Sequence, residues 1–322
     1  MMKRERTGKM IYTLTLNTSL DYTVRLSEAL RTGEVNRAAG EYLTAGGKGI
    51  TCAVMLRRLG QEVTALGFAG GITGDTVRET LLEEGVKCLL TETESPTRIN
   101  VKLSYDCVTE INCKGEGIRE EELGHLFKTL DNVSDGDYLT LSGSIPPGVP
   151  KDIYADIMKS ALAENIPVVL DAPGSIVRDC LKYRPFLVKP NMWELSEIFG
   201  EEITEIKAVA EKARELCRMG AATAIVSMGA DGALLCTERG DIYTVPAVPV
   251  HVKNTVGSGD SMVAGYLSAY INSGDPVTSL RYANAAGGAT AASIWLATGE
   301  EVEHLFEVTQ GTVLQYSEER QL

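Results

Sequence analysis

Residues 254–265 read N-T-V-G-S-G-D-S-M-V-A-G, a glycine turn followed by one carboxylate. Gly257 and Gly259 permit backbone conformations that other residues rarely adopt, so their amides and that of Ser258 can point together at a helix start. Such a helix start attracts phosphate. Asp260 stands where a phosphate would come, and it is suited to take a proton from a hydroxyl that attacks one. The motif predicts phosphoryl transfer to an alcohol; the alternative is an ordinary glycine turn in which Asp260 caps the helix.

A second polar cluster, Lys189-Pro190-Asn191 with Glu194, follows a short apolar stretch. Asn191 and Glu194 are three residues apart and therefore share one helix face. An amide and a carboxylate there can hold a hydrated Mg²⁺, which takes few direct protein ligands. Lys189 offers a positive charge for a nucleotide phosphate. The alternative is a proline-initiated helix with a polar first turn.

Three further segments carry groups that suit a sugar phosphate. Arg98 can bind a phosphate through two parallel hydrogen bonds, or it can be a solvated cation at a strand edge. Gly47 and Lys48 lie in G-G-K-G, a glycine-rich turn that lacks the full G-x-x-x-x-G-K-[ST] pattern. Asp21 can accept hydrogen bonds from sugar hydroxyls, or it can form an Asx turn after the first strand.

Composition limits the possible partners and compartments. A formal charge of −13 and a pI near 4.9 argue against nucleic acid or an anionic membrane as the main partner. Seven cysteines without C-x-x-C spacing fit a reducing compartment better than a disulfide framework or a zinc site. No segment is long and apolar enough to span a bilayer. We therefore expect a cytoplasmic protein.

The elements that must position these residues follow a βαβ rhythm. A strand at residues 11–16 opens the chain, a helix covers 50–59, and a strand at 63–68 leads through a loop at 70–75 into a helix at 76–84. Four later strands end in polar or glycine residues, at residues 138–141, 167–170, 186–188 and 224–227. Ligands of open α/β sheets bind outside the carboxyl ends of the strands, so these four loops should gather at one edge of a parallel sheet.

A polar interruption divides this rhythm. Residues 97–112 alternate in polarity on either side of a turn near Tyr105-Asp106, which predicts a hairpin that is wet on one face. We expect one domain, residues 1–322, with a small sheet from about 18–43 and 96–114 covering the core as a lid. So small a sheet needs support from the core or from a partner chain.

Taken in order, the segments resemble the ribokinase-like sugar kinases of the phosphofructokinase-B family. The series comprises N-T-S-L-D at 17–21, G-G-K-G at 46–49, G-G with G-D at 70–75, T-R-I-N-V-K at 97–102, S-G-S-I-P-P-G at 142–148, K-P-N at 189–191 and N-T-V-G-S-G-D at 254–260. T-R-I-N-V-K, S-G-S-I-P-P-G and the last motif resemble the 1-phosphofructokinase and tagatose-6-phosphate kinase branch, whose substrates already carry a phosphate.

The resemblance implies a three-layer α/β/α core with a mostly parallel sheet, ATP and Mg²⁺ as cofactors, and a homodimer formed through the lids. Asp260 is then the catalytic base, with amides from Gly257, Ser258 and Gly259. The sugar phosphate contacts Asp21, Gly47, Lys48, Arg98 and Ser142. The nucleotide contacts Lys189, Ser227, Gly229 and Asn284, with Asn284 near the adenine, and the metal side holds Asn191 and Glu194.

Two departures from the family pattern concern the sugar. The family commonly has N-P-A where this chain has Asn17-Thr18-Ser19, and an asparagine that touches the sugar where this chain has Thr51. We expect a kinase that converts fructose 1-phosphate into fructose 1,6-bisphosphate, with tagatose-6-phosphate kinase as the alternative. A catalytically silent sugar-phosphate sensor conflicts with the intact Asp260. A nicotinamide-dependent oxidoreductase lacks its G-x-G-x-x-G after the first strand.

Overall fold

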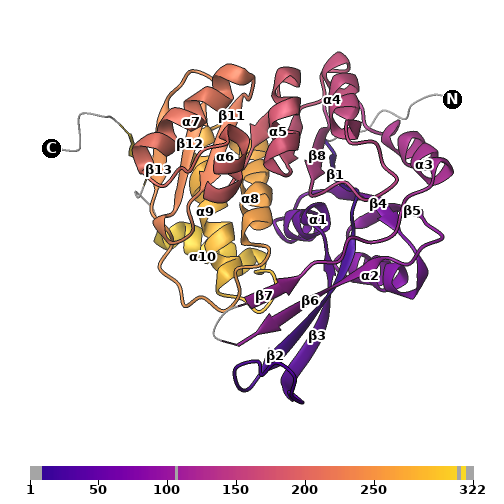
Figure 1. Ribbon diagram of the computed structural model, residues 1–322. Helices are drawn as coiled ribbons and strands as arrows, with labels where there is room; N and C mark the ends of the chain where they lie inside the picture. Colours follow the sequence, from indigo (N-terminus) through magenta and orange to yellow (C-terminus); the bar gives the residue numbers. More distant parts are fainter. Residues whose placement is uncertain (1–8, 106–107, 310–312, 317–322) are drawn as a thin grey trace.

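The computed structural model describes residues 9–105, 108–309 and 313–316. Within these residues the strands form a ten-stranded sheet, in the order β14-β13-β12-β11-β10-β9-β8-β1-β4-β5, and a four-stranded sheet, in the order β3-β2-β6-β7 (Figure 1). The strands of the large sheet are β1 (Ile11–Thr15), β4 (Val63–Ala69), β5 (Lys87–Glu92), β8 (Tyr138–Ser142), β9 (Val168–Asp171), β10 (Leu187–Val188), β11 (Thr223–Ser227), β12 (Ala233–Thr237), β13 (Ile242–Val245) and β14 (Leu314–Gln315). The small sheet contains β2 (Ser19–Leu26), β3 (Ala38–Gly46), β6 (Arg98–Ser104) and β7 (Val108–Ile111).

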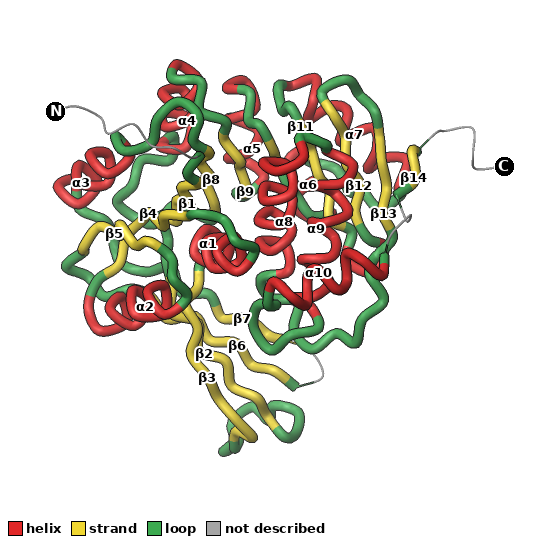
Figure 2. The backbone as a smooth tube through the Cα atoms, turned by 180° about the vertical axis from the view of Figure 1, so that it is seen from behind, coloured by secondary structure: helices red, strands yellow, loops and turns green. Residues whose placement is uncertain are grey.

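Helices cover both faces of the large sheet (Figure 2). They are α1 (Lys48–Arg58), α2 (Gly71–Glu83), α3 (Glu120–Leu130), α4 (Ile153–Ala163), α5 (Gly174–Cys180), α6 (Met192–Phe199), α7 (Ile206–Met219), α8 (Ser258–Ser273), α9 (Pro276–Ala291) and α10 (Gly299–Val308). One buried apolar cluster joins the sheet to α3, α4, α5, α6 and α7, and the other joins it to α1, α2, α8, α9 and α10. The expected three-layer α/β/α core is therefore confirmed.

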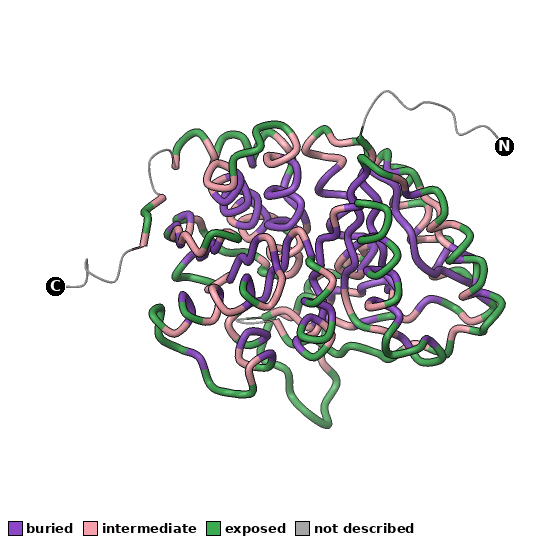
Figure 3. Tube along the Cα trace, turned by 90° about the horizontal axis from the view of Figure 1, so that it is seen from above, coloured by how far each residue is buried: buried purple, intermediate pink, exposed green. Residues whose placement is uncertain are grey.

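The sheet is parallel from β5 through β11, and it changes direction at its far edge. Leu14 on the central strand lies beside Leu66 on one side and Leu141 on the other. Strands β12, β13 and β14 continue the sheet in antiparallel pairs, which the sequence did not predict. Figure 3 shows that the buried residues are concentrated in the middle of the molecule, in the strands of the large sheet and in the helices packed on them. The carboxyl ends of the parallel strands consequently open at one edge.

The four-stranded sheet, called the lid below, projects from the large domain beside that edge (Figure 1). Its two middle strands, β2 and β6, are parallel, while β3 and β7 pair with them antiparallel. The second, smaller sheet expected from the sequence is thus present. Part of the expected hairpin turn, Asp106, lies outside the described residues.

The expected loop at residues 70–75 is wrong, because α2 already begins at Gly71. Gly70, the residue before α2, is fixed by two hydrogen bonds to Thr97. The Thr97 hydroxyl accepts from the amide of Gly70 at 3.1 Å, and the Thr97 amide donates to the carbonyl of Gly70 at 2.8 Å. A side chain at Gly74 would come within 2.9 Å of the backbone of Ala69. The glycines therefore allow the first turn of the helix to pack closely on β4, whereas in the sequence they resemble a loop.

Candidate active site

The glycine turn identified in the sequence forms the start of α8. Gly257 is its N-cap with φ +82°, and Asp260 lies in the first turn. The side chain of Asn254 accepts a hydrogen bond from the amide of Val256 at 3.0 Å and fixes the turn just before the cap. No side chain caps the helix start. The amide of Ser258 donates to the carbonyl of Thr255 at 3.2 Å, so the amides that follow it are the ones that an anion can meet.

Asp260 is mostly enclosed by the surrounding protein, and it lines a cavity of about 610 Å³. Burial, reinforced by the negative charge of Asp171, raises the pKa of Asp260 to about 7. The positive charges of Lys48 and Lys189 act in the opposite direction and limit this rise. A carboxylate with a pKa near neutral is suited to exchange a proton during a reaction.

Two lysines and two carboxylates form a charge network at the ends of β9 and β10. The Nζ atom of Lys48 lies 2.9 Å from Asp171 Oδ1 and 3.1 Å from Glu194 Oε1. Lys189 Nζ lies 3.7 Å from the other oxygen of Asp171. Burial alone would raise the pKa of Asp171, but the two ammonium groups hold this pKa below its usual value. The network keeps four buried or half-buried charges compensated beside Asp260.

Asn191 and Glu194 cap the start of α6. The side chain of Asn191 accepts from the amide of Glu194 at 2.8 Å, and Glu194 Oε2 accepts from the amide of Asn191 at 2.9 Å. This reciprocal capping box fixes both side chains on one helix face, as the spacing predicted. Both residues line the cavity.

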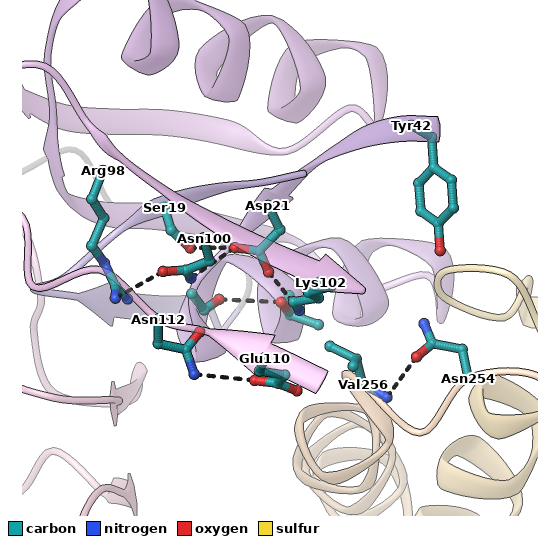
Figure 4. Close-up of polar contacts among 12 residues, drawn as sticks. Ser19, Asp21, Tyr42, Arg98, Asn100, Lys102, Glu110, Asn112, Asn254 and Val256 are labelled. Carbon is teal, nitrogen blue, oxygen red and sulfur yellow. Dashed lines mark hydrogen bonds and ion pairs between the residues drawn. The ribbon is translucent and has the colours of Figure 1, made fainter. Parts of the chain in front are cut away.

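The lid contributes a polar cluster around Asp21 (Figure 4). One carboxylate oxygen of Asp21 accepts from Ser19 Oγ at 2.7 Å and from Asn100 Nδ2 at 2.9 Å, and the other pairs with Lys102 Nζ at 2.7 Å. A side chain at Gly46 would come within 2.4 Å of the Asp21 carboxylate, so this position must be small. Asp21 is consequently a rigid, nearly buried acceptor at the lid face of the cavity.

Arg98 is held at the base of the lid by main-chain carbonyls. Its guanidinium donates to the carbonyl oxygens of Asn17 and Cys113 and to the Oδ1 atom of Asn100. The side chain is half-buried and lines the cavity. The orientation of this cation is therefore set before any anion arrives.

The cavity brings together most of the predicted site residues. Its lining includes Asp21, Gly47, Lys48, Arg98, Ser142, Lys189, Asn191, Glu194, Ser227, Gly257, Gly259 and Asp260. Three other predicted site residues, Ser258, Gly229 and Asn284, are not among the described residues that line the cavity. Asn284 is buried, and its amide donates to the carbonyl of Pro246 at 2.9 Å. Gly229 begins a short 3-10 turn after β11.

Sequence reasoning missed three residues that hold the site together. Asp171 ends β9, and the rule that ligands gather at strand ends could have identified it. Asn100 and Lys102 are buried and alternate with less buried residues along β6, and only the pairing of β6 with β2 reveals that they face Asp21. In the residues that the structure covers, no group of three or more histidine, cysteine or acidic side chains is arranged to hold a metal by itself.

Comparison with known proteins assigns the fold and the site to one family. The model of the pfkB family carbohydrate kinases matches residues 14–300. The chain belongs to this family. As a carbohydrate kinase it is a phosphotransferase with an alcohol acceptor, and the family resemblance seen in the sequence is confirmed. Of the helices that the structure describes, none has the length and apolar character needed to cross a membrane.

Several members of the family are similar over nearly their full length. A 1-phosphofructokinase of Bacillus subtilis is 38% identical over 305 residues, covering 95% of this chain and 100% of the relative. A D-tagatose-1-phosphate kinase of Bacillus licheniformis is 36% identical, covering 88% and 93%. The crystal structure of phosphofructokinase-2 from Escherichia coli in complex with substrates and products has a TM-score of 0.88 at 28% identity, covering 93% of this chain and 99% of that one.

Proposed function

We propose that this pfkB family kinase transfers the γ-phosphoryl group of ATP to the C6 hydroxyl of fructose 1-phosphate, forming fructose 1,6-bisphosphate and ADP. The observation that carries the proposal is the position of Asp260, a carboxylate with a pKa near 7 between uncapped helix amides and the lid. Relatives named 1-phosphofructokinase, which are 35–38% identical over 81–95% of this chain, support this substrate.

In the proposed reaction, Asp260 accepts the proton of the C6 hydroxyl while the new oxygen–phosphorus bond forms. The bond between the γ-phosphorus and the β,γ-bridging oxygen breaks, and ADP leaves with that oxygen. The amides of Gly257, Ser258 and Gly259 stabilise negative charge on the transferring group. A side chain at Gly259 would come within 3.1 Å of Lys189 Nζ, so this ammonium lies against the same turn.

On the sugar side, Asp21 accepts hydrogen bonds from hydroxyls, and Arg98 binds the phosphate that the substrate already carries. The fixed guanidinium of Arg98 supports this assignment, because a cation already oriented loses little side-chain entropy on binding. Four of its five N–H groups donate to Asn17, Asn100 and Cys113, so binding a phosphate through two hydrogen bonds requires one of these bonds to be exchanged. Gly47, Lys48 and Ser142 complete the sugar side, and the Lys48 ammonium, which pairs with Glu194, borders the metal side as well. Ser142 lies at the end of β8 and lines the cavity.

On the nucleotide side, we assign Lys189 and Ser227 to the ATP phosphates, and Gly229 and Asn284 to the nucleoside. Lys189 and Ser227 line the cavity at neighbouring strand ends, since Ser227 bridges to Asn191 across the sheet. Gly229 and Asn284 are not among the described residues that line the cavity, and their assignment rests on the family resemblance.

A magnesium ion fits the donor set near Asn191 and Glu194. Mg²⁺ is bound with one or two carboxylates, several waters and the substrate phosphates, so a cage of acidic side chains is not required. Glu194 supplies a carboxylate that lines the cavity, and Asn191 supplies an amide beside it. When bound with ATP, the ion would neutralise charge on the phosphates.

The alternative sugar is tagatose. The tagatose relatives are named D-tagatose-1-phosphate kinase, whereas the sequence suggested tagatose 6-phosphate as the alternative substrate. Fructose 1-phosphate and tagatose 1-phosphate differ only in configuration at C4, and both offer the C6 hydroxyl to Asp260. Thr51 lines the cavity, but its hydroxyl donates to the carbonyl of Gly47 at 3.2 Å, which limits its use for a sugar hydroxyl.

A comparison of kcat/KM on fructose 1-phosphate, tagatose 1-phosphate, fructose 6-phosphate and tagatose 6-phosphate, with ATP, tests the proposal. We expect the highest value for fructose 1-phosphate. A higher value for a 6-phosphate would overturn the assignment of the acceptor hydroxyl. A preference for tagatose 1-phosphate would change the identity of the sugar, but the C6 hydroxyl would remain the acceptor and Asp260 the proposed base.

We further propose a homodimer formed through the lids. The lid face opposite Asp21 is mostly apolar, because Tyr22, Val24, Leu43, Ile99, Val101, Leu103 and Ile111 lie on it. Two polar residues share this face, Thr109 and Glu41, and the Glu41 carboxylate accepts a hydrogen bond from the Tyr22 hydroxyl. Leu43, Ile99 and Ile111 are each more than 40% exposed. A four-stranded sheet with one apolar face in water gains stability when a second copy covers that face.

A further inference from the structure

The two carboxylates of the charge network are occupied by donors from the chain itself. Glu194 binds the Asn191 amide through Oε2 and the Lys48 ammonium through Oε1. Asp171 binds Lys48 through Oδ1 and faces Lys189 through Oδ2. Lys48 Nζ thus lies within 3.1 Å of both carboxylates, at the position where a divalent cation would meet Glu194.

A metal ion and this ammonium exclude each other. Mg²⁺ requires ligand oxygens at about 2.0–2.1 Å, and an ammonium bound to the same oxygen would lie close enough for strong repulsion. Glu194 can therefore ligate a metal only after Lys48 has moved away from Oε1.

The surroundings determine which cation can move. The Lys48 side chain is 33% exposed and follows Gly47, whereas the Lys189 side chain is 4% exposed. When Lys48 leaves, Asp171 retains Lys189, but Glu194 retains no cation within ion-pair distance among the described residues. The departure of Lys48 therefore exposes one specific carboxylate, that of Glu194.

We propose that Lys48 is a positioning residue that occupies the divalent-cation position in the empty enzyme and releases Glu194 when the metal–nucleotide complex binds. The released ammonium turns to the phosphate oxygens that arrive with the metal, so the number of compensated charges is preserved. Until then, Lys48 holds Glu194 and Asp171 in place beside Asp260. This inference rests on the proposed function, in which Glu194 meets the metal.

The test is a titration of nucleotide-free protein with Mn²⁺, followed by the electron paramagnetic resonance signal of the free ion. Lys48→Met and Lys48→Gln remove the competing charge, so both should bind Mn²⁺ about tenfold or more tightly than the wild type. Adding Glu194→Gln to either variant should abolish this gain. Lys212→Met is the matched control, because Lys212 also pairs with two glutamates, Glu201 and Glu215, but lies outside the cavity.

Unchanged Mn²⁺ affinity in folded Lys48 variants, or a gain that survives Glu194→Gln, would overturn the inference. If neither variant folds, a crystal structure of the wild type with Mg²⁺ and a non-hydrolysable ATP analogue decides the matter. We expect Lys48 Nζ to contact phosphate oxygen and to have left Glu194; an intact pair would contradict the exchange. Failure of the proposed function is separate, since it appears as an absence of sugar-phosphate turnover in the wild type.

Discussion

At the scale of single residues, Asp260 offers the most direct test of the proposed chemistry. Asp260→Asn keeps the volume of the side chain and removes the proton acceptor. We expect a folded protein that still binds ATP, with turnover lowered by a factor on the order of 10² or more. Thermal melting, ATP calorimetry and a coupled ADP assay measure the three properties. Turnover equal to the wild type would end the assignment of the base.

The raised pKa of Asp260 predicts the pH dependence. The carboxyl group must be ionised to accept a proton, so kcat/KM for the sugar phosphate should fall as the pH decreases below about 7. The negative charge of Asp171 contributes to the raised pKa, so Asp171→Asn should move this acidic limb to lower pH. Asp75→Asn, an exposed carboxylate on α2, is the control and should leave the limb in place.

The substrate also ionises, because a sugar phosphate has a second pKa of about 6. That ionisation is the same for every variant. A limb that stays in place in folded Asp171→Asn would therefore assign the titration to the substrate and not to Asp260.

A variant of Arg98 should affect the KM values of the two substrates differently. Arg98→Ala removes the proposed phosphate grip, so KM should increase much more for the sugar phosphate than for ATP. Arg25→Ala, an exposed arginine on the same lid, should change neither KM. Equal increases in both KM values would show that Arg98 supports the site only through its bonds to main-chain carbonyls.

Some of these residues were predictable because their geometry is local. The turn before Asp260 and the capping pair Asn191 and Glu194 each lie within one short segment, and the structure forms both. The network around Lys48 was not predictable, because its partners lie 123 and 146 residues away in the sequence. The roles assigned to these side chains stay predictions until the variants are measured.

At the scale of elements, the start of α8 affects both the stability of the helix and the proposed anion site. Gly257 has φ +82°, and a side chain there would come within 3.0 Å of Leu296 and 3.2 Å of Thr51. Gly257→Ala should therefore lower both the melting temperature and turnover. Gly274→Ala at the other end of the same helix is the matched control, because Gly274 has φ +67° and open space around it.

The control should lose about 1–2 kcal/mol of stability through its left-handed backbone and keep its turnover. Chemical unfolding and the ADP assay distinguish the two glycines. Full activity in Gly257→Ala would show that the turn tolerates a side chain and that its amides are not critical for transfer.

The order of the helices and strands along the chain was predictable, but the pairing of the strands within the two sheets was only partly predictable. Alternating strands and helices predicted the parallel sheet, since each strand in turn carries a polar end. The parallel pairing of β2 with β6 joins segments from both parts of the lid, and no local pattern in either strand specifies that register. Strands β12 and β13 were missed because they follow the last recognised strand without an intervening helix pattern, and β14 was missed because it has only two residues.

At the scale of the whole molecule, the lid predicts the oligomeric state. Leu43→Lys and Ile111→Lys place charges on the exposed apolar lid face and should convert the proposed dimer into monomers. Val35→Lys is the control, because Val35 is 79% exposed but lies outside the lid strands. Analytical ultracentrifugation measures the mass. A wild-type monomer, or a dimer that persists in both lid variants, would contradict this interface.

The charge distribution of the molecule also bears on its substrates. The chain has a formal charge of −13, yet Lys48, Lys189, Arg98 and Lys102 all line the one cavity that contains Asp260 among the described residues. Phosphorylated substrates are thus repelled by the overall charge and attracted at this cavity. The fold supplies the local cations for it from α1, the lid and the end of β10.

Only Gly47 separates the last residue of lid strand β3 from the first residue of α1, which is Lys48. Its backbone, at φ +103°, is consequently the joint between the lid sheet and a helix that begins at the cavity. Any tilt of that sheet changes the path of the chain one position before the ammonium. We therefore expect that binding of one substrate changes the affinity for the other, with the backbone of Gly47 as the connection between the two sides.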